Sequence, residues 1–314
     1  MLHLFENPIG TTERQIIHDQ MELMVAGESL GFDSVWPAEH HFSEYGFCGS
    51  VQVSLAAVAA RTSKIRLGTG VVVLPFHHPV RVAEDFAFLD QMSGGRIDFG
   101  VGRGYQPREF KGFGVKQEDS REIFDESINL IQKCWTEDSV TFQGKHFQVE
   151  DLSVRPKPLQ QPHPPIYMAC LQPDTFEIVG RYGFNLLLSS SFGLSAERAK
   201  EGLAKYREAR RQAGFDPDGG QVGFLLKVYP GKTMEQARAD FRDPVTWFYR
   251  TIAKYVAPPA SESPVASYEA YAESRKVAET VEFEDLVDGP GIVCGDVDHC
   301  IEKLSRLTRE FGFN

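Results

Sequence analysis

Two adjacent histidines, His40 and His41, follow the short apolar run Asp33–Trp36, whose composition is typical of a β-strand. An imidazole can accept or donate a proton near neutral pH, so a histidine at a strand end is a candidate general acid or base. Neighbouring residues of an extended segment point in opposite directions, and we therefore expect only one of the two to face a site. A pair of surface histidines is the alternative. A metal site is a weaker one, because no second ligand motif has suitable spacing.

Two glycines, Gly68 and Gly70, interrupt the apolar segment Ile65–Leu74. Glycine weakens a strand and commonly marks the close approach of a ligand or of another backbone. We expect Gly70 to lie near the carboxyl end of this strand. Tight packing without any ligand is the alternative explanation.

Arg103 lies between two glycines at the end of the apolar run Ile97–Val101. The local GxGxG pattern does not predict a dinucleotide-binding fold, because no helix begins at its last glycine and no acidic residue follows at the required distance. Arg121, at the start of the next helix, could converge with Arg103 on one anion, and two guanidinium groups suit a phosphate monoester. An ion pair with Asp125 is the alternative role for Arg121.

The segment Tyr167–Thr175 passes from an apolar run into a helical pattern. The free backbone N–H groups at residues 172–175 would form a second candidate anion site. Asp174 is equally explained as the residue that caps this helix.

Short apolar strands alternate with longer helical patterns along the chain. Strands are predicted at Leu2–Phe5, Asp33–Trp36, Ile65–Leu74, Ile97–Val101, Pro165–Cys170, Phe184–Ser189 and Val222–Tyr229. Helices are predicted at Thr11–Leu30, Ser50–Ala60, Pro79–Met92, Glu118–Trp135, Asp174–Tyr182, Ser195–Ala213, Thr233–Val256 and Asp298–Phe311. This alternation implies parallel strands with right-handed crossovers, and so many units favour an α/β fold of the (β/α)8-barrel type.

The barrel is expected to form one domain over residues 1–314, with its active site at the carboxyl ends of the strands. Only seven strand-and-helix units are recognisable, which leaves open that the last unit is absent. Val140–Phe142 and His146–Val149 predict a small hairpin insertion around Gly144.

The composition excludes several classes of protein. The 33 Lys and Arg against 44 Asp and Glu give a net charge of −11, so no general attraction to nucleic acid or to an anionic membrane is expected. The five cysteines are odd in number and form no CxxC, which argues against a zinc site and a disulfide framework. Neither a membrane-spanning run nor a signal-peptide pattern is present, and we predict a cytoplasmic protein.

Several of these segments, taken together, resemble the bacterial luciferase-like flavin monooxygenases. The match is dense from residue 28 to residue 135 and thinner beyond. It is carried by Gly31–Trp36, Glu39–Phe42, Leu67–Gly70, Leu74–Pro75, His78–Arg81, Glu84–Asp85, Leu89–Ser93, Gly95–Arg96, Phe99–Gly100 and Arg103–Gly104.

The resemblance implies a barrel that binds reduced FMN, supplied by a separate reductase. The flavin would react with O₂ at C4a to give a hydroperoxide that oxygenates a small organic substrate such as an aldehyde. His40 matches the catalytic histidine of the family, and Gly70 and Val71 match a peptide bond behind the flavin ring, which we expect to be cis. The further cofactor contacts that it implies are Arg103 and Arg121 at the phosphate, and Tyr105, Ala169 and Thr175 elsewhere on the flavin.

The same resemblance implies a homodimer through the helices Ser50–Ala60 and Pro79–Met92.

Other functions stay open. An oxidoreductase that uses the deazaflavin F420 would share the fold but would need more basic residues around the phosphate site. A non-catalytic flavin-binding partner subunit would have no need of His40. A sugar- or phosphate-processing barrel lacks a convincing pair of carboxylates at the strand ends.

Overall fold

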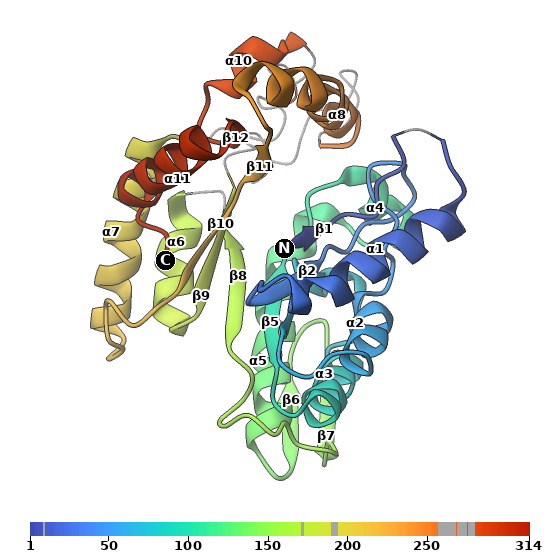
Figure 1. Cartoon of the computed structure of the whole chain (residues 1–314). Helices are drawn as coiled ribbons and strands as arrows, with labels where there is room; N and C mark the ends of the chain where they lie inside the picture. Colours follow the sequence, from blue (N-terminus) through green and yellow to red (C-terminus); the bar gives the residue numbers. More distant parts are fainter. Residues whose placement is uncertain (9, 171–172, 190–193, 257–267, 269–274, 276–279) are drawn as a thin grey trace. The chain divides into compact units, whose positions relative to one another are not determined.

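The computed structural model describes residues 1–8, 10–170, 173–189, 194–256, 268, 275 and 280–314 (Figure 1). The chain divides into two compact units, Met1–Ile166 and Tyr167–Asn314. Each unit is built from alternating strands and helices, and each contains parallel strands.

The strands of the first unit are β1 (Leu2–His3), β2 (Ser34–Pro37), β3 (Arg66–Gly68), β4 (Val72–Val73) and β5 (Ile97–Gly102). They pair in parallel in the order β1-β2-β3-β5, and β4 also pairs with β5. The antiparallel hairpin of β6 (Val140–Gln143) and β7 (Gln148–Leu152) confirms the predicted insertion.

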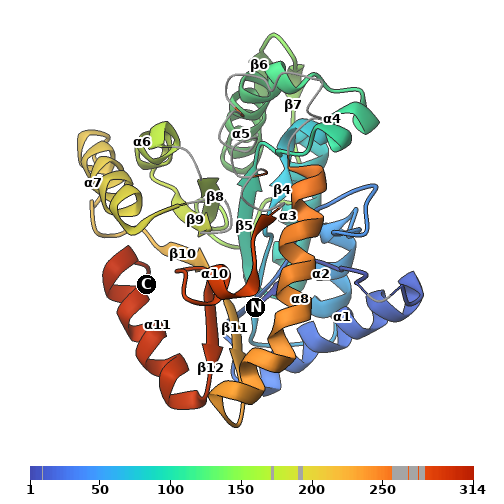
Figure 2. The same ribbon diagram turned by 90° about the horizontal axis from the view of Figure 1, so that it is seen from above.

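The helices of this unit are α1 (Glu13–Ser29), α2 (Val51–Ala59), α3 (Pro79–Ser93), α4 (Pro107–Phe113) and α5 (Ser120–Thr136), with 3-10 turns η1 (Leu74–Phe76) and η2 (Gln117–Asp119). Helices α2 and α3 pack side by side, as do α3 and α5 (Figure 2).

The core of the first unit forms around β5, all six residues of which are buried. Phe99 of β5 contacts Phe86 of α3 and Trp135 of α5, with ring centroids 4.7 and 5.1 Å apart. The indole N–H of Trp135 donates to the carbonyl of Ala83, which satisfies the polar end of this buried ring. Burial of these aromatic faces fixes the strand ends from which the polar loops emerge.

The second unit contains the strands β8 (Ile166–Cys170), β9 (Asn185–Ser189), β10 (Val222–Leu225), β11 (Lys227–Pro230) and β12 (Ile292–Gly295). Strand β9 pairs in parallel with β8 and β10, and β11 pairs in parallel with β12. Its helices are α6 (Pro173–Tyr182), α7 (Ala196–Gln212), α8 (Met234–Tyr255), α10 (Phe283–Val287) and α11 (Val297–Phe311).

The strands of the second unit differ from the predicted strands in two details, and the short helix α10 was not predicted. The expected strand Val222–Tyr229 is broken at Leu226 into β10 and β11, which have different partners. Strand β12 was not predicted, because only three apolar residues stand between Gly291 and Gly295; all three are buried. The last helix therefore follows a strand of its own. Gly312, with φ +66°, ends that helix, and Asn314 exchanges hydrogen bonds with the backbone of Val222.

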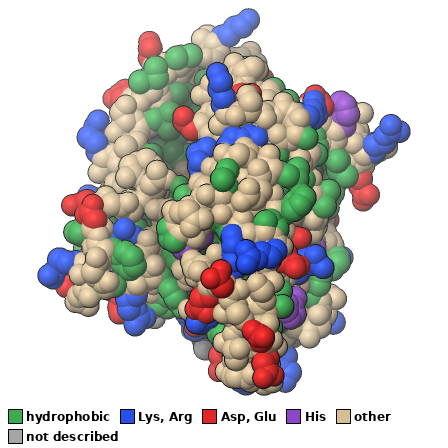
Figure 3. Space-filling model, turned by 90° about the horizontal axis from the view of Figure 1, so that it is seen from below, with side chains coloured by type: hydrophobic (Ala, Val, Ile, Leu, Met, Phe, Trp, Pro, Cys, Tyr) green, Lys and Arg blue, Asp and Glu red, His purple; other side chains and the backbone are tan. Residues whose placement is uncertain are grey.

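The surface carries both signs of charge. On the face shown in Figure 3, Lys and Arg side chains are interspersed with Asp and Glu. Among the helices that the structure describes, none has the length and apolar character needed to cross a membrane.

Candidate active site

The loop that follows β2 carries Glu39, His40 and His41, and all three side chains are buried. The two imidazoles contact different carboxylates, His40 that of Glu109 and His41 that of Glu39. This is consistent with the alternation of an extended segment. The alternative of two surface histidines is wrong, because both rings are at least nine-tenths buried.

His40 is held on one side by the short helix α4. Its Nδ1 lies 3.1 Å from Oε1 of Glu109 and 3.1 Å from Nε2 of Gln106. The Glu109 carboxylate can only accept, so Nδ1 carries the proton when it donates to Glu109, and in that tautomer it does not accept from the Gln106 amide. In the neutral ring, Nε2 then presents a lone pair. Glu109 therefore determines which nitrogen of His40 is available as a base.

The other side of His40 faces two tyrosines. The Tyr105 hydroxyl lies 3.4 Å from His40 Nε2 and 3.4 Å from the Tyr45 hydroxyl. The His40 ring centroid is 4.9 Å from that of Tyr45 and 5.7 Å from that of Tyr105. Burial raises the pKa of the Tyr105 hydroxyl well above its usual value, so this group stays protonated. The free nitrogen of His40 thus faces a hydroxyl in surroundings with little water.

A second polar cluster surrounds Glu39. Its Oε1 lies 3.0 Å from His41 Nε2 and 2.8 Å from His77 Nε2, and its Oε2 accepts from the Val73 N–H at 3.0 Å. Burial opposes the charge of Glu39, but the hydrogen bonds from His41 and His77 outweigh it and lower the pKa of the carboxyl. Within the described residues, no group of three His, Cys, Asp or Glu side chains is arranged to hold a metal ion.

Gly68 and Gly70 have different reasons to be glycine. A Cβ on Gly68 would lie 2.2 Å from the Trp36 ring, so tight packing accounts for that position. The peptide bond between Gly70 and Val71 is cis, which confirms the expectation. The Gly70 N–H donates to the carbonyl of Pro37, and a Cβ there would lie 2.7 Å from Leu2. The backbone of Gly70 is therefore tightly enclosed on that side.

The two arginines flank the loop between β5 and α5. Arg103 directly follows β5, and Arg121 lies in the first turn of α5; both are half-buried. Gly104, with φ +75°, lies where a Cβ would be 2.8 Å from Val73, which brings this loop against β4. The convergence of the two guanidinium groups on one anion stays a prediction.

The remaining predicted contacts belong to the second unit. Ala169 lies in β8 opposite Leu187 of β9, and Thr175 is buried in the first turn of α6. The predicted anion contact at Gln172 lies outside the described residues, as does the capping side chain of Asp174.

Glu109 was not among the predicted site residues, although the sequence contains a signal for it. Gln106, Glu109, Phe110 and Phe113 have the i, i+3, i+4, i+7 spacing of one helix face. A carboxylate among phenylalanines on one face indicates a buried acid with a specific partner. The sequence alone assigned no role to His77.

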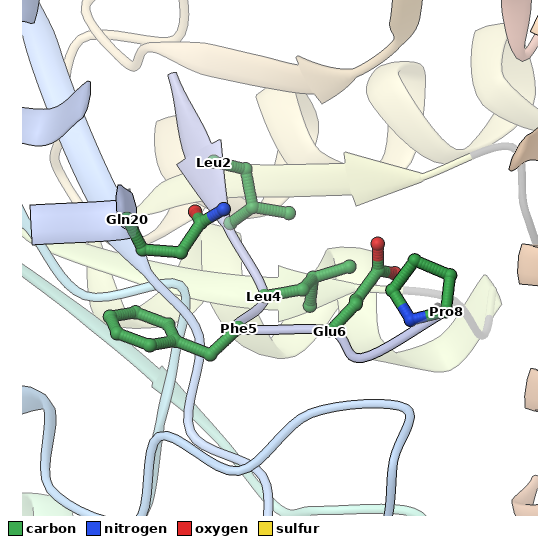
Figure 4. Close-up of a pocket in the computed structure, with 6 residues that line it drawn as sticks. All are labelled: Leu2, Leu4, Phe5, Glu6, Pro8 and Gln20. Atoms are coloured by element: carbon green, nitrogen blue, oxygen red, sulfur yellow. The ribbon is translucent and has the colours of Figure 1, made fainter. Parts of the chain in front are cut away.

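A pocket opens beside the N-terminal strand (Figure 4). Its lining residues are Leu2, Leu4, Phe5, Glu6, Pro8 and Gln20. None of the predicted site residues lines it. It adjoins the site, however, because Leu2 abuts Gly70 and the Leu4 carbonyl lies against Gly46, whose Cβ position is 3.0 Å from His40.

Residues 1–314 match the luciferase-like monooxygenase family. The chain belongs to this family. The monooxygenases among the matched relatives and neighbours are oxidoreductases.

Two alkanal monooxygenase alpha chains are among the similar curated proteins. That of the Kryptophanaron alfredi symbiont is 34% identical over 209 residues, which are 67% of this chain and 58% of the relative. That of Photobacterium phosphoreum is 41% identical over 150 residues, which are 48% of this chain and 42% of the relative. The matched segments thus span about half the length of these relatives.

Solved structures of similar fold extend the comparison. A monooxygenase, RslO1, from Streptomyces bottropensis has a TM-score of 0.83 at 28% identity and covers 99% of this chain and 88% of its own. The oxygenating constituent of 3,6-diketocamphane monooxygenase from Pseudomonas putida, in complex with FMN, has a TM-score of 0.78 at 20% identity, covering 98% and 87%. An F420-dependent secondary alcohol dehydrogenase has a TM-score of 0.76 at 21% identity, covering 94% and 86%. These likenesses confirm the predicted α/β barrel class.

Proposed function

We propose that this protein is a flavin-dependent monooxygenase that uses reduced FMN and O₂ to oxygenate a small organic substrate such as an aldehyde. The observation that carries the proposal is the state of His40. Glu109 holds one ring nitrogen, and the other faces the buried Tyr105 hydroxyl. Such a histidine can move a proton while water is kept away.

The residues at the strand ends of the first unit fit a flavin. Gly70 and Val71 offer a backbone surface without a side chain at Gly70, and Gly104 leaves the loop around Arg103 close to β4. Arg103 and Arg121 would bind the phosphate by charge-assisted hydrogen bonds. Tyr105 in the first unit, and Ala169 and Thr175 in the second, are the further proposed contacts.

When bound, reduced flavin supplies two electrons to O₂, and one oxygen atom then passes to the substrate while the other leaves as water. The chain's own residues control the protons of this reaction. His40 Nε2 accepts or returns a proton, Glu109 keeps Nδ1 protonated, and the Tyr45 and Tyr105 rings limit the access of water. A separate reductase is proposed as the source of the reduced flavin.

The surface of α2 and α3 fits the proposed homodimer. Val53 of α2 and Phe88 of α3 are 70% and 57% exposed, which is unusual for such apolar side chains on two neighbouring helices. Sedimentation at micromolar concentration should show a dimer. A species of 35.2 kDa, the mass of one chain, would contradict this part of the proposal.

An F420-dependent reaction is the second candidate, and the structural likeness to an F420-dependent dehydrogenase is what favours it. Anaerobic titrations with reduced FMN and with reduced F420, followed by fluorescence and then by exposure to air, separate the two. We expect tight binding of FMN and, with an aldehyde present, consumption of O₂ with formation of the carboxylic acid. Binding of F420 alone, with hydride transfer that needs no O₂, would replace the proposal by the second candidate.

A further inference from the structure

His77 belongs to a continuous series of hydrogen bonds that ends at His40. His77 Nε2 lies 2.8 Å from Glu39 Oε1, which is also 3.0 Å from His41 Nε2. The backbone N–H of His41 donates to Oε1 of Glu109 at 2.9 Å, and the same oxygen lies 3.1 Å from His40 Nδ1. Two buried carboxylates therefore link the three histidines, and the step from Glu39 to Glu109 passes through the side chain and backbone of His41.

The contacts of Glu39 join two separate strand ends. Its Oε1 holds His41 in the loop after β2, and its Oε2 holds the Val73 N–H in β4, three residues beyond Gly70. A carboxylate with this many donors is firmly placed only while it is ionised, because a protonated oxygen would have to act as a donor itself. Its charge in turn needs a positive partner, since an isolated buried charge is costly.

His77 is the better placed of the two imidazoles to supply that charge. Its side chain is 22% exposed, whereas that of His41 is 9% exposed, so charging His77 gives up less hydration. The groups that act on His77 electrostatically are Glu39 in the loop after β2 and Asp85 on α3, and both favour its charged form. Burial opposes the charge, but the hydrogen bond to Glu39 outweighs it and raises the pKa of His77.

We propose that His77 is a positioning residue: as an imidazolium it keeps Glu39 ionised, and through Glu39 it holds His41 and the Val73 amide, so that the loop carrying His40 stays fixed relative to β4. In this arrangement His41 is neutral and donates from Nε2, and His77 carries the single charge that balances Glu39. The effect on catalysis rests on the proposed flavin function. The expected hydrogen bond between His41 and Glu39 does not depend on that function.

The test uses two variants of the full chain. His77→Phe keeps a ring and removes the donor, and His77→Gln keeps a donor and removes the charge. With reduced FMN and aldehyde, we expect His77→Phe to lower kcat about tenfold with little change in the KM for FMN, because a small displacement of a catalytic group is enough for such a loss. We expect His77→Gln to retain more activity and to lose the fall in activity that the wild type shows as pH rises through the raised pKa of His77.

A measurement without substrate separates this proposal from the proposed function. Nitrogen NMR of the flavin-free protein should show His41 as one tautomer, protonated at Nε2, and that signal should broaden or shift in both variants. If the protein does not turn over flavin, this result still decides the role of His77. If His77→Phe does not fold, His77→Gln carries the test.

His18→Gln is the matched control, because His18 lies on α1 with a side chain that is 66% exposed. It should leave kcat, the pH profile and the His41 signal unchanged. The proposal would be overturned by His77 variants with the wild-type pH profile and an unchanged His41 signal. Equal changes in His18→Gln would overturn it as well, because the effect would then not depend on Glu39.

Discussion

The two histidine–carboxylate clusters of the first unit contain the same chemical groups but leave their imidazoles in different states. Around His40, one carboxylate binds one ring nitrogen, and the second nitrogen faces the Tyr105 hydroxyl. Around Glu39, one carboxylate is shared by His41 and His77, and its other oxygen accepts a backbone N–H. The first cluster leaves one ring nitrogen facing a hydroxyl, while the second uses its hydrogen bonds to join segments of the chain.

The neighbours of each cluster explain the difference. His40 lies against the Tyr45 and Tyr105 rings, and the Tyr105 hydroxyl brings a polar atom to Nε2 of His40. The His41 ring instead contacts phenylalanines, with the Phe113 centroid 4.7 Å away and the Phe42 centroid 5.5 Å away. Among the residues that the structure describes, the ring contacts of His41 thus bring it no hydroxyl like that of Tyr105. The packing around them thus gives these adjacent histidines different surroundings, and this difference supports the proposal that His40 serves the chemistry and His41 the structure.

Replacing His40 by Ala gives the largest expected effect on activity. The variant should fold and should bind reduced FMN, because the arginines proposed for the phosphate are separate residues. Product formation should fall by ~10²-fold or more, the usual range for a lost acid–base group, while O₂ consumption continues and yields hydrogen peroxide. Product and peroxide are measured per flavin oxidised. An unchanged product yield would show that His40 takes no part in the chemistry and would remove the distinction between the clusters.

Arg103→Ala separates binding of the cofactor from the chemistry of His40. Loss of charge-assisted hydrogen bonds worth ~1.5–3 kcal/mol should weaken FMN binding by about one to two decades, and Arg103→Lys should fall between because Lys cannot bind in a fork. Riboflavin, which lacks the phosphate, should bind equally to all three proteins. Parallel loss of riboflavin and FMN affinity in titrations would show that Arg103 is structural.

Matched substitutions at the two carboxylates compare the clusters directly. Glu109→Gln should lower kcat about tenfold, because an amide can present either a donor or an acceptor to Nδ1 of His40 and no longer fixes the tautomer. Glu39→Gln should lower the free energy of unfolding by about 2–3 kcal/mol, because a buried acceptor of several hydrogen bonds loses its charge, and should lower kcat about as much as His77→Phe does, because the loop that carries His40 is then less firmly held. Urea unfolding and steady-state kinetics measure both variants. The reverse pattern, with Glu39→Gln inactive but stable, would exchange the roles of the clusters.

Much of the architecture could be predicted because local sequence patterns indicate its strands, helices and turns. Apolar runs alternating with helices indicated the parallel strands, and the turn at Gly144 indicated the hairpin. Strand β12 was not predicted, because three apolar residues between glycines are too few to distinguish a strand from a loop. Its identity as a strand depends on pairing with β11, some sixty residues earlier, which no local pattern records.

The site was predicted in part for the same reason. His40, Gly70 and Arg103 stand at strand ends, where the fold class itself directs attention. Glu109 lies 69 residues from His40, and their contact depends on how α4 packs rather than on either local sequence. The role of His77 depends likewise on Glu39, 38 residues away. Types of residue at strand ends could therefore be read from the sequence, whereas the partners that set their protonation could not.

The smallest expected effect is a pH dependence of stability that belongs to the Glu39 cluster alone. The pKa of His77 is raised in the folded protein, so its stabilisation is complete below the ordinary histidine value of about 6.5 and is lost as pH rises through the raised value. The pKa of Glu39 is lowered, so its contribution is lost only as pH falls below the ordinary carboxyl value. Both contributions are present together near pH 6.

The alkaline side gives the cleaner measurement. On the acid side Glu28 also titrates, because the backbone N–H groups of Ile65, Lys64 and Ser63 lower its pKa to about 2. Urea unfolding of the wild type and of His77→Gln should therefore differ most at pH 6, and the difference should shrink by about 1 kcal/mol by pH 9. His40 lies in the other cluster. The difference in free energy of unfolding between the wild type and His40→Ala should therefore not show the decrease between pH 6 and pH 9 that is expected for His77→Gln. A gap between wild type and His77→Gln that stays constant from pH 6 to pH 9 would mean that His77 is not charged when it binds Glu39, and the contrast between the two clusters would then rest on packing alone.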